Sequence, residues 1–538
     1  MNKKRSSVLI YIILVSAVLI AKVLGLIRGM VFSAAYGTTV EASAFTAVSN
    51  LPLTIFDITF GTAITSAFVP VFNEKLFVNV RKGADKKTKK DAIKAGKKEA
   101  NKFASNFLNI VLLFSLILVV LIMIFPQYAV MLVASGFDSN SQAMAIATDL
   151  MRYIAPVITF ACCTYIFIGV LQSYEEFIAP ALVSLLSNLS MIVYLLFLNK
   201  EFKIDGLAIA FSVGWLLQFV FLIPFLKKKK FKYSLILDFR SDDIKKVAVL
   251  TLPLFVAAVA QPINQLISSN FSSRVSESGI ATVSYAYNAY LIVAGVFSYA
   301  LTNMFFPKMS RKFAQNDVDG ATEICKNMLS SITAIIVPIM VFVGSCAEPI
   351  IKILYQRGEF TADDTKSVAS LLVIYAIAMI ALSWQDIFNK YFYSMQMPKV
   401  PMLSAAVGIV INVVLSVLLI FVFDFGLKGL ASATVIAGFS MVLVLALCSL
   451  KYTRKIFTPD FAFELLKVFI GGAAAFAVCR ILLAVLNFNV SLVLQVIFVL
   501  LILALALAVY ILFLFILKSR NISEIKSVLK KGDDPKNV

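Results

Sequence analysis

Three charged side chains lie inside otherwise apolar sequence near the N-terminus. Lys22 and Arg28 belong to one long apolar segment, and Asp57 belongs to the next. A basic group at the centre of a membrane helix costs about 2.5–3.5 kcal/mol on insertion scales, so such residues normally face a bundle interior or a wet cavity. Lysine supplies a mobile point charge and arginine a bidentate fork, and both can replace the water around a pyrophosphate. This pattern predicts a membrane transporter with an anionic substrate.

The spacing of these charges leaves their roles open. Lys22 and Arg28 are about 240° apart on an ideal helix, so only a bend, which the neighbouring glycines would permit, brings both to one cavity. Glycine is equally often a close-packing residue in membrane helices, and Arg28 stands where an arginine can snorkel to the outer interface. Asp57 follows Pro52, which we expect to kink its helix. Asp57 is either a proton- or cation-coupling group or a fixed ion-pair partner of Lys22 or Arg28.

Three further polar positions are candidate substrate contacts. Arg152 lies near the outer end of an apolar segment, where headgroup anchoring and cavity lining are equally consistent with its place. Asn264 and Asn288 are uncharged and suited to hydrogen bonds with a sugar or a peptide. Polar residues of this kind also hold membrane helices together, so both interpretations stand.

The composition defines the class of protein. The 538 residues are 60% hydrophobic and 15% charged, with a mean hydropathy of +0.91, which indicates a polytopic membrane protein. The chain has no histidine, which excludes His-based zinc sites and Ser-His-Asp triads. It also has no P-loop motif. We therefore expect no enzymatic site, no metal and no organic cofactor, with energy supplied by Na⁺ or H⁺ coupling or by the membrane potential.

Counting runs of about 20 apolar residues predicts an all-α protein with fourteen transmembrane helices. The expected spans are 8–33, 43–71, 104–125, 142–173, 178–199, 205–226, 247–271, 279–306, 326–346, 365–395, 400–422, 427–450, 462–487 and 492–517.

The 49 Lys and Arg residues fall mostly in alternate gaps between these spans. The positive-inside rule then places both termini in the cytoplasm, as an even number of helices requires. Because the charge of +19 is concentrated in these gaps, we expect the basic loops to contact anionic lipid headgroups and expect no nucleic-acid partner. The opposite gaps contain only Lys200, Lys203, Arg274, Lys352, Arg357, Lys366 and Lys428.

Short motifs recur in the same order in the two halves of the chain. The pairs are residues 68–70 with 305–307, 180–182 with 401–403, and 206–208 with 429–431. They predict two six-helix lobes related by a pseudo-two-fold axis along the membrane normal, with substrate bound between them. The expected parts are an N-lobe at 1–226, a basic cytoplasmic linker at 227–246, a C-lobe at 247–450, and two further helices with a basic tail at 451–538. The last two helices are either packing elements or a wall for a lipid tail.

Several stretches resemble one family of transporters. They are KVLGLIRGMVFSAAYG from Lys22, the following ASAF, LP and SAFVPVFNE, then LMRYIAP at 150–156 and YFYSMQMPKVPML at 391–403. Together they resemble the MurJ/MviN family of lipid II flippases, within the larger group of multidrug and polysaccharide exporters. The resemblance covers essentially the whole chain. It implies a fourteen-helix fold in the bacterial cytoplasmic membrane and export of an undecaprenyl-linked anionic glycolipid in peptidoglycan biosynthesis. We expect the chain to act as a monomer.

The chain also departs from the pattern that this resemblance implies. Family members usually carry arginine at Lys22, aspartate at Gly29 and Ser43, a basic pair at Phe56 and Asp57, and arginine at Asn288. Carboxylates that some members use for sodium fall on Ser268 and Ser416. The coupling-ion candidates here are therefore Asp57, Asn412 and Thr434.

Two alternative functions remain open at the level of sequence. One is export of a different substrate on the same fold. That substrate is either another lipid-linked polysaccharide unit or a drug, and a cation-coupled drug exporter would use Asp57 as its carboxylate. The other is a non-transporting scaffold in envelope assembly. Measured translocation of a substrate separates these from a lipid II flippase.

Overall fold

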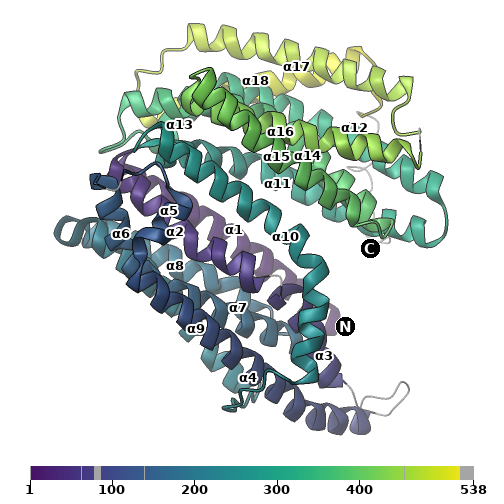
Figure 1. Ribbon diagram of the computed structural model, residues 1–538. Helices are drawn as coiled ribbons and strands as arrows, with labels where there is room; N and C mark the ends of the chain where they lie inside the picture. The colour runs from purple at the N-terminus through teal and green to yellow at the C-terminus, as the bar shows by residue number, and fades with distance from the viewer. Residues whose placement is uncertain (1, 62, 78–85, 139, 454, 522–538) are drawn as a thin grey trace. The chain divides into compact units, whose positions relative to one another are not determined.

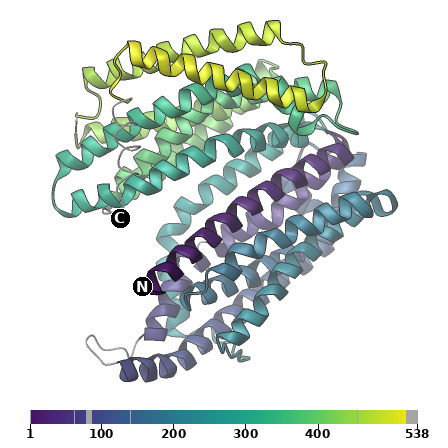
Figure 2. The same ribbon diagram turned by 180° about the vertical axis from the view of Figure 1, so that it is seen from behind.

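The computed structural model describes residues 2–61, 63–77, 86–138, 140–453 and 455–521. Every regular element among them is a helix, and all fourteen predicted spans fall on helical stretches (Figures 1 and 2). Eleven helical stretches of the described chain are long and apolar enough to cross a membrane. Predicted spans 43–71, 247–271 and 279–306 are helical but fall outside those eleven. The structure confirms the all-α class.

By packing, the chain divides into two compact units. The first unit is Met1–Ala281 with Arg357–Glu359, and the second is Thr282–Gln356 with Phe360–Val538. The helix predicted at 247–271 thus packs with the first unit, while the division into repeats at 226 and 247 stays a prediction from the sequence motifs.

The first unit pairs its helices along their lengths, with α8 against α9 and α1, α2 against α6, and α7 against α9. Its elements are α1 (Asn2–Tyr36), α2 (Val40–Phe56), the π-helices η1 (Asp57–Gly61) and η2 (Ala63–Phe68), α3 (Val69–Phe77), α4 (Lys86–Ile124), α5 (Pro126–Val133), α6 (Gln142–Ile154), α7 (Val157–Ser173), α8 (Ile178–Phe197), α9 (Asn199–Lys228) and α10 (Asp242–Val275).

Polar contacts hold the end of α10 against the loop between α5 and α6. The Ser135 hydroxyl donates to Asn270 Oδ1 at 2.7 Å, and the Gly136 amide donates to Ser273 Oγ at 3.0 Å. A Cβ on Gly136 would lie 2.3 Å from the Arg274 nitrogen, so the approach of the two backbones requires glycine. Because η1 and η2 also pack on α10, this helix belongs to the first unit.

The second unit is built on α12, α14 and α16, with α15 packed on α16 and with α17 packed on α12 and α18. Its elements are α11 (Gly279–Ala314), α12 (Val318–Ser345), α13 (Ala347–Tyr355), α14 (Ala362–Ser394), α15 (Lys399–Val417), the π-helix η3 (Leu418–Val422), α16 (Gly426–Leu450), α17 (Pro459–Val485) and α18 (Leu492–Ile516).

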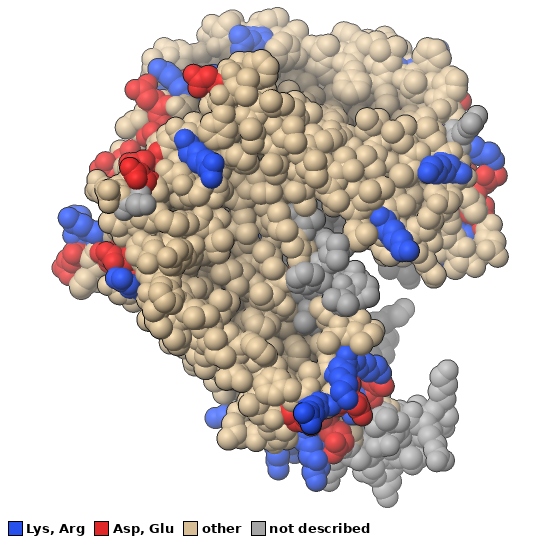
Figure 3. All heavy atoms as spheres, viewed as in Figure 1, with Lys and Arg blue, Asp and Glu red and all other residues tan. Residues whose placement is uncertain are grey.

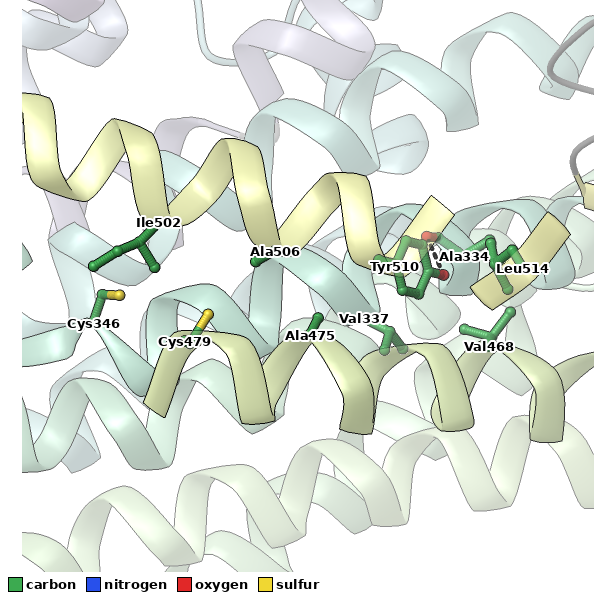
Figure 4. Close-up of a cluster of buried hydrophobic side chains, with 10 residues drawn as sticks. All are labelled: Ala334, Val337, Cys346, Val468, Ala475, Cys479, Ile502, Ala506, Tyr510 and Leu514. Atoms are coloured by element: carbon green, nitrogen blue, oxygen red, sulfur yellow. Dashed lines mark hydrogen bonds between the residues drawn. The ribbon is translucent and has the colours of Figure 1, made fainter. Parts of the chain in front are cut away.

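The last two long helices pack on α12 through a buried apolar cluster (Figure 4). Small residues such as Ala475 and Ala506 allow α17 and α18 to lie close together, and Tyr510 reaches across to the backbone of α12. These helices are therefore packing elements of the second unit, and a role as a lipid-tail wall stays a prediction. The cluster comprises Ala334, Val337, Cys346, Val468, Ala475, Cys479, Ile502, Ala506, Tyr510 and Leu514.

On the face shown in Figure 3, most charged side chains lie toward the margins, and the surface between them is largely uncharged with a few isolated Lys or Arg side chains. Large apolar side chains are exposed on the long helices of both units, for example Leu196, Leu443 and Leu500. Such surfaces fit contact with lipid hydrocarbon.

Candidate functional site

The helix that carries Asp57 changes its winding at that residue. The α2 helix continues through Pro52 to Phe56, and π-helical winding begins at Asp57. The Asp57 side chain is exposed, and a Cβ on Gly61 would stand 3.2 Å from its Oδ1 atom. Phe56 stacks on Tyr165 at 4.7 Å and fixes the neighbouring turn. Because π-helical turns often occur at functional sites, this winding supports a role for Asp57.

The two cations of α1 lie in different surroundings. The α1 helix is a single α-helix through both of its glycines. Arg28 is half-buried toward α8, where its Nη1 lies 3.9 Å from Met191 Sδ, while Lys22 is exposed. The bend that would bring Lys22 and Arg28 to one face is thus not seen in this conformation, and the spacing of about 240° persists.

None of these three charges has a fixed partner. Among the residues that the structure describes, no carboxylate lies within 4.0 Å of the nitrogens of Lys22 or Arg28, and Asp57 makes no ion pair. The alternative in which Asp57 is tied to either cation is therefore not formed. A half-buried arginine without a counter-ion is costly, so Arg28 is well suited to an anionic ligand.

The other substrate candidates lie on separate helices. Arg152 in α6 is exposed and forms an ion pair with Asp149 of its own helix at 3.0 Å. Asn264 is partly buried in α10, the helix on which Asp57's π-helical segment packs. Asn288 in α11 of the second unit is exposed and donates to Ser284 Oγ at 3.3 Å.

The remaining coupling-ion candidates lie on the packed pair α15 and α16. Asn412 is buried, and its Oδ1 accepts a hydrogen bond of 3.5 Å from the Ser416 hydroxyl. The Thr434 hydroxyl donates to the Leu430 carbonyl of its own helix at 3.1 Å. Among the described residues no group of three or more His, Cys, Asp or Glu side chains is arranged to hold a metal ion.

Sequence reasoning missed a cavity in the first unit whose lining includes charged residues. Its volume is about 450 Å³, and it lies where the end of α1 meets the start of α9. The Tyr36 hydroxyl donates to Asn199 across its wall. The sequence contains one indication of this cavity. Lys200 and Lys203 lie close together in one of the gaps between spans on the side of the membrane where Lys and Arg are rare. The lining residues are Ala35, Tyr36, Thr39, Glu41, Ile146, Asn199, Lys200, Lys203, Ile204 and Glu359.

A comparison with family models identifies the family to which this chain belongs. The model described as lipid II flippase MurJ matches residues 32–505. The chain belongs to the lipid II flippase MurJ family. MurJ homologues are transporters and not enzymes, which confirms the prediction of a transporter, and the family is one of the bacterial inner membrane.

Individual MurJ relatives are similar over most of their length. A probable lipid II flippase MurJ of Rickettsia prowazekii is 25% identical over 409 residues, which is 76% of this chain and 77% of the relative. One from Bdellovibrio bacteriovorus is 26% identical over 465 residues, or 86% and 85% of the two chains. The resemblance deduced from the motifs is therefore confirmed.

Solved structures show the same fold. A lipid II flippase MurJ in an inward closed conformation has a TM-score of 0.75 at 24% identity, covering 93% of this chain and 98% of the other. An inward-facing multidrug resistance transporter of the MATE family has a TM-score of 0.57 at 15% identity, covering 82% and 99%. The MurJ likeness is thus the stronger of the two.

Proposed function

We propose that this chain translocates lipid II, an undecaprenyl-linked cell-wall precursor, across the bacterial cytoplasmic membrane by alternating access. The family match supports the substrate class. The observation that carries the mechanism is the half-buried, unpaired guanidinium of Arg28 on α1. In a membrane, an anionic headgroup is the ligand that best offsets such a charge.

Each candidate residue has a place in this proposal. Arg28 and Lys22 hold the pyrophosphate in successive conformations, since one conformation does not present both on one face. Asn264 and Asn288 bind the sugar or peptide, and Arg152, already paired with Asp149, contributes least. Na⁺, H⁺ or the membrane potential drives the cycle through Asp57 or through Asn412 with Thr434.

The orientation of the chain in the membrane follows from the distribution of Lys and Arg along the sequence. Both termini lie in the cytoplasm, and the basic stretches 74–102 and 227–246 contact the anionic headgroups of the inner leaflet. The chain acts as a monomer.

The test is replacement of the resident flippase in cells depleted of it. We expect the unaltered chain to restore growth and Arg28→Gln and Lys22→Gln to fail at equal expression. Lys366→Gln, at an exposed lysine paired with Asp363, is the matched control and should restore growth. In parallel, binding of purified lipid II to the protein in detergent should weaken at least tenfold in Arg28→Gln.

Two outcomes would contradict this proposal. An unaltered chain that neither restores growth nor binds lipid II transports something else, and another undecaprenyl-linked glycan is then the alternative. Arg28→Gln and Lys22→Gln variants that restore growth fully would exclude these cations from headgroup binding.

A further inference from the structure

The segment that joins α9 to α10 is extended and lies along α4 in the first unit. Residues 231–238 have no helical winding, and their backbone is bonded to side chains of α4. We call residues 231–239 the strap. An extended segment without a neighbouring strand must find other partners for its amides and carbonyls.

Two asparagines of α4 supply those partners. Asn106 Nδ2 donates to the Asp238 carbonyl at 2.8 Å, and the Asp238 amide donates back to Asn106 Oδ1 at 2.7 Å. This pair of bonds is what a neighbouring β-strand would provide. Asn109 Nδ2 donates to the Ile236 carbonyl at 2.8 Å and to the Ser234 carbonyl at 3.2 Å.

Two further bonds fix the start of the strap. The Ser234 amide donates to Ser105 Oγ at 3.1 Å, and the Tyr233 hydroxyl donates to Asn109 Oδ1 at 2.7 Å. The strap is therefore held along one flank of α4 by its backbone and by the Tyr233 side chain.

Three apolar side chains of the strap are exposed. Leu235 is 88% exposed, Leu237 53% and Phe239 47%, while Ser234 and Ile236 between them are partly buried. Phe239 packs edge-on against Phe114 of α4 at 6.1 Å. That contact makes the strap continuous with the exposed apolar flank of a predicted membrane span.

Four lysines without ion-pair partners in the described part of the chain lie just before the strap and at its start, and one of them, Lys228, lies over the Phe225 ring at 5.3 Å. Lys227, Lys228, Lys230 and Lys232 are exposed, and none has an ion-pair partner among the described residues. Lys229 differs, because it pairs with Glu176 at 3.2 Å. Lysines close to an anionic membrane surface are attracted to its lipid headgroups.

We propose that the strap lies in the cytoplasmic leaflet and, with these four lysines, forms a binding site for an anionic phospholipid. Leu235, Leu237 and Phe239 contact its acyl chains, and the lysines contact its phosphate. The proposal rests on the orientation given under the proposed function. Its structural basis is that exposed lysines and exposed apolar side chains follow one another along a segment that is bound to α4.

The first experiment measures the depth of the strap. Leu235→Trp in lipid nanodiscs should show tryptophan fluorescence, corrected for the two native tryptophans, that is quenched by phospholipid brominated in mid-chain and protected from aqueous iodide. Lys366→Trp, at an exposed position near the start of α14, is the control and should show the reverse. Iodide quenching of Leu235→Trp equal to that of the control would overturn the proposal.

The second experiment measures lipid selectivity. Phosphatidylglycerol, added to the full chain in detergent, should raise the melting temperature more than phosphatidylcholine does. Replacing the four lysines by glutamine should remove at least half of that difference, and replacing them by arginine should keep it. An unchanged difference in the glutamine variant would overturn the lysine site.

Neither experiment uses transport as its readout. A chain that fails to replace the flippase but passes both tests contradicts the proposed function and keeps the lipid site. A chain that replaces the flippase but fails both tests supports the proposed function and contradicts the lipid site.

Discussion

The hydroxyl of Tyr510 in α18 donates a 2.7 Å hydrogen bond to the carbonyl of Ala334 in α12 (Figure 4). In an α-helix this carbonyl would accept from the amide four residues later, but that residue is Pro338, which has no amide hydrogen. Tyr510 therefore satisfies a buried carbonyl that α12 cannot satisfy by itself. The contact joins the helices outside the repeat to the rest of the second unit.

Tyr510→Phe should lower the free energy of unfolding by about 1–3 kcal/mol, because it leaves that buried carbonyl unpaired. The measurement is equilibrium unfolding of the detergent-solubilised chain. Tyr128→Phe, at an exposed tyrosine, is the matched control and should change stability little. In a Pro338→Ala background the new amide can bond to Ala334, so the cost of Tyr510→Phe should shrink; an equal cost in both backgrounds would contradict this explanation.

Lys203→Gly should stabilise the chain. Lys203 has φ of 48° and ψ of −140° inside α9, a conformation that strains a side chain by about 1–3 kcal/mol, and the Tyr194 hydroxyl holds its carbonyl at 2.6 Å. Glycine removes that strain, and we expect a gain of about 1 kcal/mol in the same unfolding assay. Lys200→Gly, at an ordinary helical position, should instead lose about 0.5–1 kcal/mol. Equal losses at both positions would show that Lys203 is unstrained.

Asp317 should make stability depend on pH at the start of α12. The Lys312 ammonium donates to its carboxylate at 2.6 Å and the Gly320 amide donates at 2.8 Å, and these bonds hold the pKa of Asp317 below its ordinary 3.8. Because the folded pKa is depressed, this contribution is present above the ordinary pKa and is lost as the pH falls through the folded value.

The Asp317→Asn variant tests this dependence. It should melt below the unaltered chain at pH 7, and the difference should shrink below about pH 4. Lys312→Gln should give a similar pH dependence of the difference, since it removes the charged partner. A difference in melting temperature that is constant from pH 7 to pH 3 would refute the role of this carboxylate.

Asp57→Asn should uncouple transport from an ion gradient if Asp57 carries the coupling ion. In proteoliposomes, translocation by the unaltered chain should rise when a proton or sodium gradient is imposed, and the variant should respond no more than it does without a gradient. Asn412→Leu is the comparison, because it removes the buried amide of the other candidate site. Gradient dependence retained in Asp57→Asn and lost in Asn412→Leu would move the coupling site to α15.

The helices could be located from the sequence, but the partners of their polar residues could not. The apolar runs located all fourteen helical spans, because the length and composition that a bilayer demands can be counted along a chain. Asn106 and Asn109 lie in one of those runs and gave no distinct signal. Their partners are backbone groups of residues 234–238, more than 120 positions away, and only folding brings them together.

The site residues show the same limit. Lys22, Arg28 and Asp57 were recognisable because a charge in an apolar run is costly. Only the structure showed that none of them forms an ion pair with another residue of the described part of the chain. The π-helical winding at Asp57 and the packing of that segment on α10 were not expected from the sequence. Pro52 suggested a break, and the break falls five residues later.

By itself the sequence determined the all-α membrane class, the spans and the family, because hydrophobic length and motif order are local properties of the chain. The tertiary structure decided that α10 packs with the first unit, that Tyr510 replaces the missing amide of Pro338, and that the strap is bound along α4. Each of these depends on which distant groups satisfy a buried carbonyl or amide. Packing of the folded chain determines which groups pair, and the local sequence around either partner does not predict it.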